Sequence, residues 1–262
     1  MPTHPRHLFK PWMLLAVASV WSLLFVACET TQRTVVAPAQ IAGATYVGAQ
    51  QCAECHAEVA GHFDGSTHSN LAVNDDNAAS SCEACHGPGS LHVAAGGGKG
   101  TIINPEKSPE TCFQCHLDKR GQFSLPNSHP LMAGKVTCSD CHDPHEGNAT
   151  KGKGGATLEA ESETCTKCHT AQKGPFVFKH NAMIEGCTVC HNPHGSVNAR
   201  MLAQRDANLC NKCHLERPAV AGNGTIVVGT EDHRSRLMNG TCWVAGCHEA
   251  VHGSNSSKAL RY

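Results

Sequence analysis

One short pattern recurs along this chain and limits what the chain can fold into. Cys-x-x-Cys-His occurs seven times, and an eighth copy at residues 242–248 is widened to four residues between its cysteines. Successive first cysteines lie 22 to 32 residues apart, which makes a loose repeat with one motif per unit. Units this short cannot enclose a large group alone, so neighbouring units must contact each other.

The pattern is typical of covalent attachment of a c-type haem. Two cysteines separated by one short turn can bond to the two vinyl groups of a porphyrin, and the following histidine can ligate the iron. A zinc half-site, a redox dithiol or a disulfide would explain one Cys-x-x-Cys, but none requires a histidine after all eight. The sequence therefore predicts eight covalently bound haem c groups. In the widened copy, either Cys242 forms its thioether from a longer loop or Cys247 binds alone.

The eight copies define the predicted attachment residues. The thioether cysteines are Cys52, Cys55, Cys82, Cys85, Cys112, Cys115, Cys138, Cys141, Cys165, Cys168, Cys187, Cys190, Cys210, Cys213, Cys242 and Cys247. The proximal iron ligands are His56, His86, His116, His142, His169, His191, His214 and His248. Of the 17 cysteines, Cys28 is left over.

Few side chains are available for an ordinary core. Aromatic residues make up 5% of the 262 residues, and ordering a Gly-rich chain costs more free energy than so few large apolar groups return. The expected fold is a multihaem cytochrome c fold. It is irregular and loop-rich, with short α-helices around an extended chain of eight haems and little or no β-sheet. The formal net charge of −1 gives no reason to expect nucleic acid as a partner.

Residues 1–27 resemble a bacterial secretory signal peptide, with a basic start and an apolar run of 17 residues. Export is also what c-type haem attachment requires. Residues 24–28 (Leu-Phe-Val-Ala-Cys) resemble a lipoprotein box, so we expect Cys28 to be lipidated and to anchor the mature chain to a membrane. Glu29 favours the outer membrane over the inner membrane. The alternative is an uncleaved or ordinarily cleaved signal with a spare cysteine.

The rest of the chain divides by its motifs. Residues 28–48 contain no motif, and after Cys28 they are expected to form a flexible tether. A Gly-rich tract at residues 151–155 separates residues 49–150, with four motifs, from residues 151–262, with the other four. Short helices are expected after several motifs, as over residues 53–63, and no alternating pattern is long enough for a sheet.

The second axial ligand of each iron separates an electron carrier from a catalyst. Outside the signal segment and the motifs nine histidines remain, close to one per motif, against only four methionines. We therefore expect bis-histidine, low-spin irons of low potential. His145 and His194 each follow a proximal histidine by three residues. Each starts on the proximal face of its own porphyrin, so we expect it to reach an adjacent one and to bind neighbouring haems together.

Several stretches resemble the MtrA/DmsE/PioA decahaem cytochromes. They are residues 82–92 (Cys-Glu-Ala-Cys-His-Gly-Pro-Gly-Ser-Leu-His), 120–123, 127–130, 138–145, 173–176, 180, 187–198 and 252–255, so the resemblance covers most of residues 46–255. It implies a periplasmic protein whose staggered haems enter or dock into an outer-membrane β-barrel. It also implies the distal ligands, which are His68, His92, His129, His145, His180, His194, His233 and His252. His62 becomes the spare histidine. The chain has eight motifs where the family has ten haems.

These observations predict an electron carrier rather than an enzyme. The leading hypothesis is an octahaem conduit, anchored to the outer membrane from the periplasm. Its expected partners are a β-barrel porin and other redox cytochromes, in extracellular electron transfer or anaerobic respiration. The alternative is a multihaem reductase or oxidase of the nitrite, hydroxylamine or tetrathionate type, which needs one open iron, with the widened eighth motif as the place for it. A third hypothesis is an extracellular haem filament.

Overall fold

The computed structural model describes most of the region that carries the motifs. The described residues are 33–34, 40–72, 81–146, 158–214, 227–228, 231–233, 235, 242–244 and 246–262. The predicted signal segment, Cys28 and the Gly-rich tract at 151–155 lie outside these residues. Within the described part, no helix combines the length and apolar character needed to cross a membrane.

The described helices are short, and most lie on or beside a motif. The α-helices are α2 (Ala49–Ala53), α3 (Ala57–Phe63), α4 (Glu83–His86), α5 (Ser90–Ala94), α6 (Glu110–Phe113), α7 (Leu117–Phe123), α8 (Leu158–Thr166) and α9 (Ala207–His214). The 3-10 turns are η2 (Pro105–Lys107), η3 (Cys138–Asp140), η4 (Thr170–Gln172), η5 (Asn181–Ile184), η6 (Cys187–Val189) and η7 (Ala199–Met201). The helix expected over residues 53–63 is present in part, as α3, which begins at Ala57 after the motif turn, whereas Ala53 is the last residue of α2.

Strands are limited to three ladders of two residues each among the described residues. β1 (Arg33–Thr34) pairs parallel with β2 (Leu71–Ala72), β3 (Phe178–Lys179) pairs antiparallel with β6 (Gly253–Ser254), and β4 (Val227–Val228) pairs antiparallel with β5 (Glu231–Asp232). The prediction of a loop-rich fold with short helices and little sheet is confirmed.

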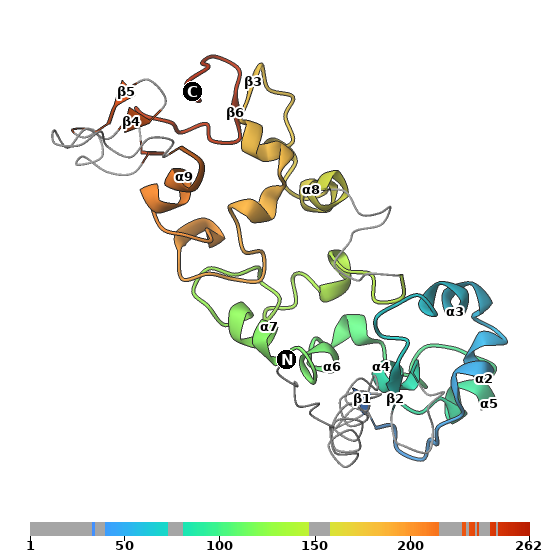
Figure 1. Ribbon diagram of the computed structural model, residues 1–262. Coiled ribbons are helices and arrows are strands. Elements are labelled where there is room, and N and C mark those ends of the chain that lie inside the picture. The colour runs from blue at the N-terminus through green and yellow to red at the C-terminus, as the bar shows by residue number, and fades with distance from the viewer. Residues whose placement is uncertain are drawn as a thin grey trace, which may run out of the picture.

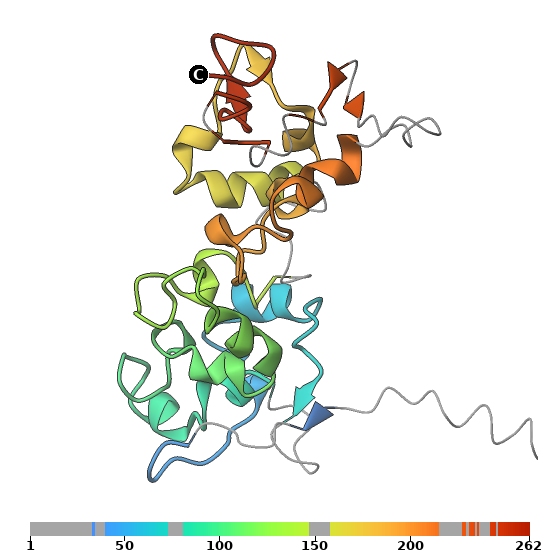
Figure 2. The same ribbon diagram turned by 90° about the vertical axis from the view of Figure 1, so that its left-hand side faces the viewer.

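The described elements form an elongated body rather than a layered domain (Figure 1). One group contains α2 to α7, and a second group, which contains α8, α9, β3 and β6, lies beyond it along the long axis. The view turned by 90° shows the same two groups end to end (Figure 2). The chain therefore extends in sequence order, as a row of motifs requires.

The regular motifs share one backbone turn. In the first six, the histidine N–H donates to the carbonyl of the first cysteine at 2.9–3.0 Å, and the second cysteine N–H donates to the same carbonyl at 3.2–3.3 Å. Residues at positions i, i+3 and i+4 lie on one face of a helical turn. Both sulfurs and the imidazole therefore start from the same side of the backbone, which is the reason for the spacing of the motif.

Little of the described chain is buried by its own apolar side chains. The buried hydrophobic residues among those described are Ala84, Phe113, Leu131 and Ala250. Burying so few groups cannot offset the conformational entropy of ordering these loops. In the described part of the chain, the apolar bulk must therefore come from groups other than side chains, as the composition indicated.

The two halves of the motif region are linked by a close backbone approach. Asn127 and Ser196 form an antiparallel bridge, with N–H···O distances of 3.2 and 2.8 Å. Beside it, Gly195 has a φ of 154°, and a Cβ there would overlap the carbonyl oxygen of Gln122 at the end of α7. Only glycine fits this position without moving α7 away from the segment that carries His194.

Replacing Gly195 with alanine should therefore destabilise the holoprotein. Overlap with a backbone oxygen and a φ unfavourable for side chains should together cost about 3 kcal/mol. The matched control is Gly121→Ala in α7, where a Cβ meets nothing within 4 Å and alanine favours the helix by up to about 1 kcal/mol. Thermal unfolding followed by circular dichroism should show a lower midpoint for the first variant and an unchanged or higher midpoint for the second.

Candidate haem-binding site

The structure brings seven of the eight motif histidines to a second histidine from another part of the chain. In each pair the second ring belongs to the set of histidines outside the motifs. The pairs, with their centroid separations, are His56–His92 (6.3 Å), His86–His145 (6.0 Å), His116–His68 (6.2 Å), His142–His194 (6.0 Å), His169–His129 (6.0 Å), His191–His252 (6.1 Å) and His214–His180 (6.0 Å).

These separations match the space that one metal ion needs between two imidazoles. With metal–nitrogen bonds of about 2.0 Å, two imidazoles on opposite sides of one ion have ring centres about 6.2 Å apart. Direct packing of aromatic rings allows a wider range, about 4.5 to 7 Å. Seven pairs that all fall between 6.0 and 6.3 Å are therefore better explained by a common gap than by packing. The residues fit a six-coordinate haem iron.

The outer ring nitrogens support this fit. Several Nδ1 atoms face an oxygen, so Nδ1–H donates and Nε2 is free to bind a metal, as is usual for histidine ligands. The Nδ1 partners are the carbonyls of Ile103 for His86 (3.0 Å), Gly98 for His92 (3.2 Å), Pro193 for His129 (2.6 Å), Val251 for His180 (2.9 Å), Arg200 for His191 (2.9 Å) and Ala259 for His248 (2.6 Å), and the Gln122 side chain for His194 (3.2 Å).

Burial keeps several of these rings neutral. Desolvation lowers the pKa of His68, His86, His194 and His252 below the ordinary value, and neighbouring charges contribute less. A neutral imidazole has the lone pair that a metal needs, whereas a protonated one does not. The environment of these histidines therefore favours the protonation state that ligation requires.

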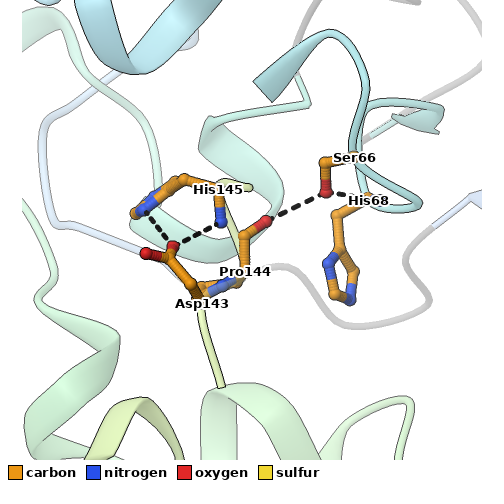
Figure 3. Close-up of polar contacts among 5 residues, drawn as sticks. All are labelled: Ser66, His68, Asp143, Pro144 and His145. Atoms are coloured by element: carbon orange, nitrogen blue, oxygen red, sulfur yellow. Dashed lines mark hydrogen bonds and ion pairs between the residues drawn. The ribbon is translucent and has the colours of Figure 1, made fainter. Parts of the chain in front are cut away.

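Two ligand-bearing loops are tied directly to each other (Figure 3). The buried Ser66 hydroxyl donates to the Pro144 carbonyl at 3.0 Å and accepts from the His68 N–H at 3.1 Å. Asp143 accepts from the His145 N–H at 3.1 Å, and its carboxylate lies 3.8 Å from His145 Nδ1. The positions of His68 and His145, which pair with different motifs, are therefore set together.

The origin of each second histidine follows a rule. The motifs are numbered 1 to 8 in chain order. For motifs 2, 4 and 6, the second histidine comes just after the motif two places further along, as His145 after motif 4 does for His86 of motif 2. For motifs 3, 5 and 7 it lies between the two preceding motifs, as with His68 for His116. Motif 1 has no preceding motifs and uses His92, which follows motif 2. Both His145 and His194 thus pair away from their own motif, with the motif two places back.

The attachment sulfurs show which motifs are neighbours. As free thiols, Cys52 and Cys82 hydrogen-bond, which raises the pKa of Cys52 and lowers that of Cys82 to about 7. Burial, followed by neighbouring groups that include a cysteine of the next motif, raises the pKa of Cys85, Cys141 and Cys190, and raises that of Cys210 to about 12. The cysteine pairs that interact between motifs are Cys52 with Cys82, Cys85 with Cys115, Cys112 with Cys138, Cys141 with Cys168, Cys190 with Cys213 and Cys210 with Cys242.

The fifth and sixth motifs also adjoin. Cys187 Sγ lies 3.8 Å from the Ser162 hydroxyl in α8, the helix that carries Cys165. Successive motifs are therefore neighbours in sequence order along the described chain.

The widened motif keeps the closing bond of the regular ones. The His248 N–H donates to the Cys242 carbonyl at 3.0 Å, although two more residues lie between them. The extra residues include Trp243, whose ring stacks under the Arg200 guanidinium at 4.3 Å from its centroid. The Arg200 carbonyl in turn accepts from His191 Nδ1. The longer loop thus keeps Cys242 beside His248 and contacts the segment that holds the histidine of motif 6.

The remaining predicted residues are placed differently. His62, predicted as the spare histidine, is exposed in α3. His233 is half-buried, and its predicted pairing with His248 stays a prediction, as does the lipidation of Cys28. Sequence reasoning did not single out Gln122, which supports His194, because it belongs to no motif and its role depends on a contact 72 residues away.

Comparisons with known proteins agree with this geometry. A family model described as a doubled CXXCH motif matches residues 129–174 and 180–219, and the model of cytochrome c554 and c-prime matches residues 19–87 and 96–143. The multiheme cytochrome MtrA of Shewanella baltica (strain OS185) is 33% identical over 147 residues, which are 55% of this chain and 43% of the relative. The chain is a multihaem c-type cytochrome related to MtrA. The predicted resemblance to MtrA-type cytochromes is confirmed, and with it haem c as the cofactor.

In this MtrA-related cytochrome, Gln122 provides the Nδ1 contact that can be removed without changing the backbone. Gln122→Leu should free the His194 ring and weaken its donation to iron, because a hydrogen-bonded imidazole is the more basic ligand. Electron paramagnetic resonance should show altered g values for one low-spin haem, with one reduction wave shifted to higher potential.

Gln114→Leu is the control for this variant, because Gln114 is exposed and lies inside a motif. If the Gln122 variant has the spectrum and potentials of the Gln114 variant, the support assigned to Gln122 is wrong.

Proposed function

We propose that the chain is an electron-carrying octahaem conduit with bis-histidine ligation at every iron. Bound haem c supplies reversible one-electron chemistry at iron. The chain's own part is to hold each attachment site, to occupy both axial positions with imidazole, and to keep successive sites adjacent. The observation that carries the proposal is the set of seven histidine pairs with a common gap of 6.0–6.3 Å.

The pairing rule supports His233 as the eighth distal ligand. At the start of the chain, His92 occupies the place that would serve a motif before the first, and it pairs with motif 1 instead. At the other end, His233 lies between motifs 7 and 8, the place that would serve a ninth motif. By the same reassignment His233 serves motif 8, which completes eight pairs and leaves His62 unused.

Adjacent motifs in sequence order favour transfer along a line. Cysteines of successive motifs interact electrostatically at six junctions, and the Cys187–Ser162 contact marks the seventh. Electron transfer weakens steeply with distance, so a row of adjacent sites replaces one long step by several short ones. Two imidazoles per iron also keep the ligand set unchanged between valence states.

The same pairing argues against the reductase or oxidase alternative. An enzyme of that class needs an axial position for its substrate, and in seven motifs a second imidazole faces the motif histidine across the metal gap. At motif 8, the proximal His248 has a carbonyl partner at Nδ1, as His86 and His191 do, and no contact among the described residues favours catalysis there.

We further propose that the conduit works at the outer membrane from the periplasmic side. The apolar segment ending at Ala27, followed by Cys28, supports export and lipidation. The resemblance to MtrA-type cytochromes supports a β-barrel porin and other redox cytochromes as partners. The lipid would hold the conduit beside such a barrel.

Carbon monoxide binding tests the ligation. The reduced full-length holoprotein should contain eight haems and bind no carbon monoxide. His180→Ala should open one iron, because His180 faces His214 at 6.0 Å, and should bind a single equivalent with the appearance of one high-spin haem. The control His62→Ala should behave like the unchanged protein, because His62 is exposed and outside the pairs.

Clear carbon monoxide binding by the unchanged protein would contradict the proposal. So would turnover of nitrite, hydroxylamine or tetrathionate in protein-film voltammetry. Either result would assign the chain to the enzyme class instead.

Mass spectrometry of the mature N-terminus tests the anchor. A mature chain that begins at a diacyl- or triacyl-modified Cys28 is the expected result, and Cys28→Ser should release the cytochrome from the membrane fraction. An unmodified Cys28 would end the lipoprotein assignment and leave the electron-transfer proposal untouched.

A further inference from the structure

Among the side chains that the structure describes, the one buried charged group is Glu83, with 1% of its surface exposed. Its carboxylate accepts hydrogen bonds from the backbone N–H groups of Val47 at 2.9 Å, Gly48 at 2.9 Å and Gly89 at 2.8 Å. All three donors are uncharged. They stabilise the carboxylate without cancelling its charge.

Glu83 lies between the first two haem attachment sites. It stands between the two cysteines of motif 2, at the start of α4. Val47 and Gly48 immediately precede α2, the helix that carries Cys52 of motif 1. The Glu83 charge acts on both sites. The pKa of Cys52 is raised by its hydrogen bond with Cys82 and by burial, and the Glu83 charge adds to this rise.

A buried charge acts more strongly on its surroundings than an exposed one. Water and salt screen surface charges, so the effect of such a charge on its surroundings is small, whereas a charge in the low-dielectric interior is screened much less. Glu54 provides the comparison, because it also lies inside a motif but is exposed and bonded to the Gln51 side chain at 2.7 Å. Of these two carboxylates, Glu83 is therefore the one whose charge is screened less by water.

We propose that Glu83 sets the potentials at one end of the conduit. Its buried charge lowers the reduction potentials of the irons at motifs 1 and 2, so that electrons enter there and leave towards motif 8. An oxidised iron carries one more positive charge than a reduced one, and a nearby negative charge therefore stabilises the oxidised form. The inference rests on the conduit function proposed above and adds a direction to it.

Glu83→Gln in the full holoprotein tests this role, because glutamine keeps the shape and removes the charge. A redox titration followed by haem absorbance should show two of the eight one-electron waves shifted to higher potential and the other six unchanged. Glu54→Gln is the matched control and should leave all eight waves in place. Glu83→Asp, which keeps the charge, should restore the two low waves.

The proposal is overturned if the Glu83→Gln waves coincide with those of Glu54→Gln. It is also overturned if all eight waves move together, since that would indicate a general loss of structure. Glutamine would point an N–H at the Gly48 N–H, so this variant can lose haem.

A second measurement therefore uses the unchanged protein, with paramagnetic NMR assignment of the haem methyl signals during stepwise reduction. Motifs 1 and 2 should be reduced last, and their reduction before motifs 7 and 8 would refute the direction. That result would leave eight low-spin irons without carbon monoxide binding, so failure of this inference is distinguishable from failure of the conduit.

Discussion

The fixed gap between paired imidazoles is the constraint on which the rest of this structure depends. In seven pairs the ring centroids lie 6.0 to 6.3 Å apart, although the two histidines of a pair are up to 61 residues apart in sequence. A chain with so few buried apolar side chains has little else to hold such segments at a defined distance. The loops, the short helices and the carbonyls that accept from Nδ1 can be understood as supports that bring each second ring to its place.

The pairing also interlocks parts of the chain that look separate in sequence. The predicted division into residues 49–150 and 151–262 stays a prediction, but two pairs cross that boundary. His142 of the first part faces His194 of the second, and His129 faces His169. The Asn127–Ser196 bridge and the close approach of Gly195 to Gln122 lie at the same place. The boundary is therefore a point where the two parts share sites, so neither part contains all the residues that its own motifs face.

Charge is distributed along the chain in a way that suits electron transfer. Burial favours neutral rings at several of the paired histidines, so these imidazoles have a nitrogen lone pair to donate to iron. The buried carboxylate of Glu83 lies beside the first two motifs, whereas the Arg200–Trp243 contact lies beside motifs 6 and 8.

The sequence alone determined the chemistry of the attachment sites, because a Cys-x-x-Cys-His turn places its sulfurs and imidazole on one side through local hydrogen bonds. It also determined the number of motifs, the shortage of core side chains and the MtrA-type resemblance. Which histidine faces which motif was decided only in the tertiary structure, since His68, His129 and His180 lie before the motifs they face and His145, His194 and His252 lie after theirs. The roles of Gln122 and Glu83 likewise arise from contacts across 72 and 36 residues. Such contacts depend on how loops return to one another, and no local spacing rule records that path.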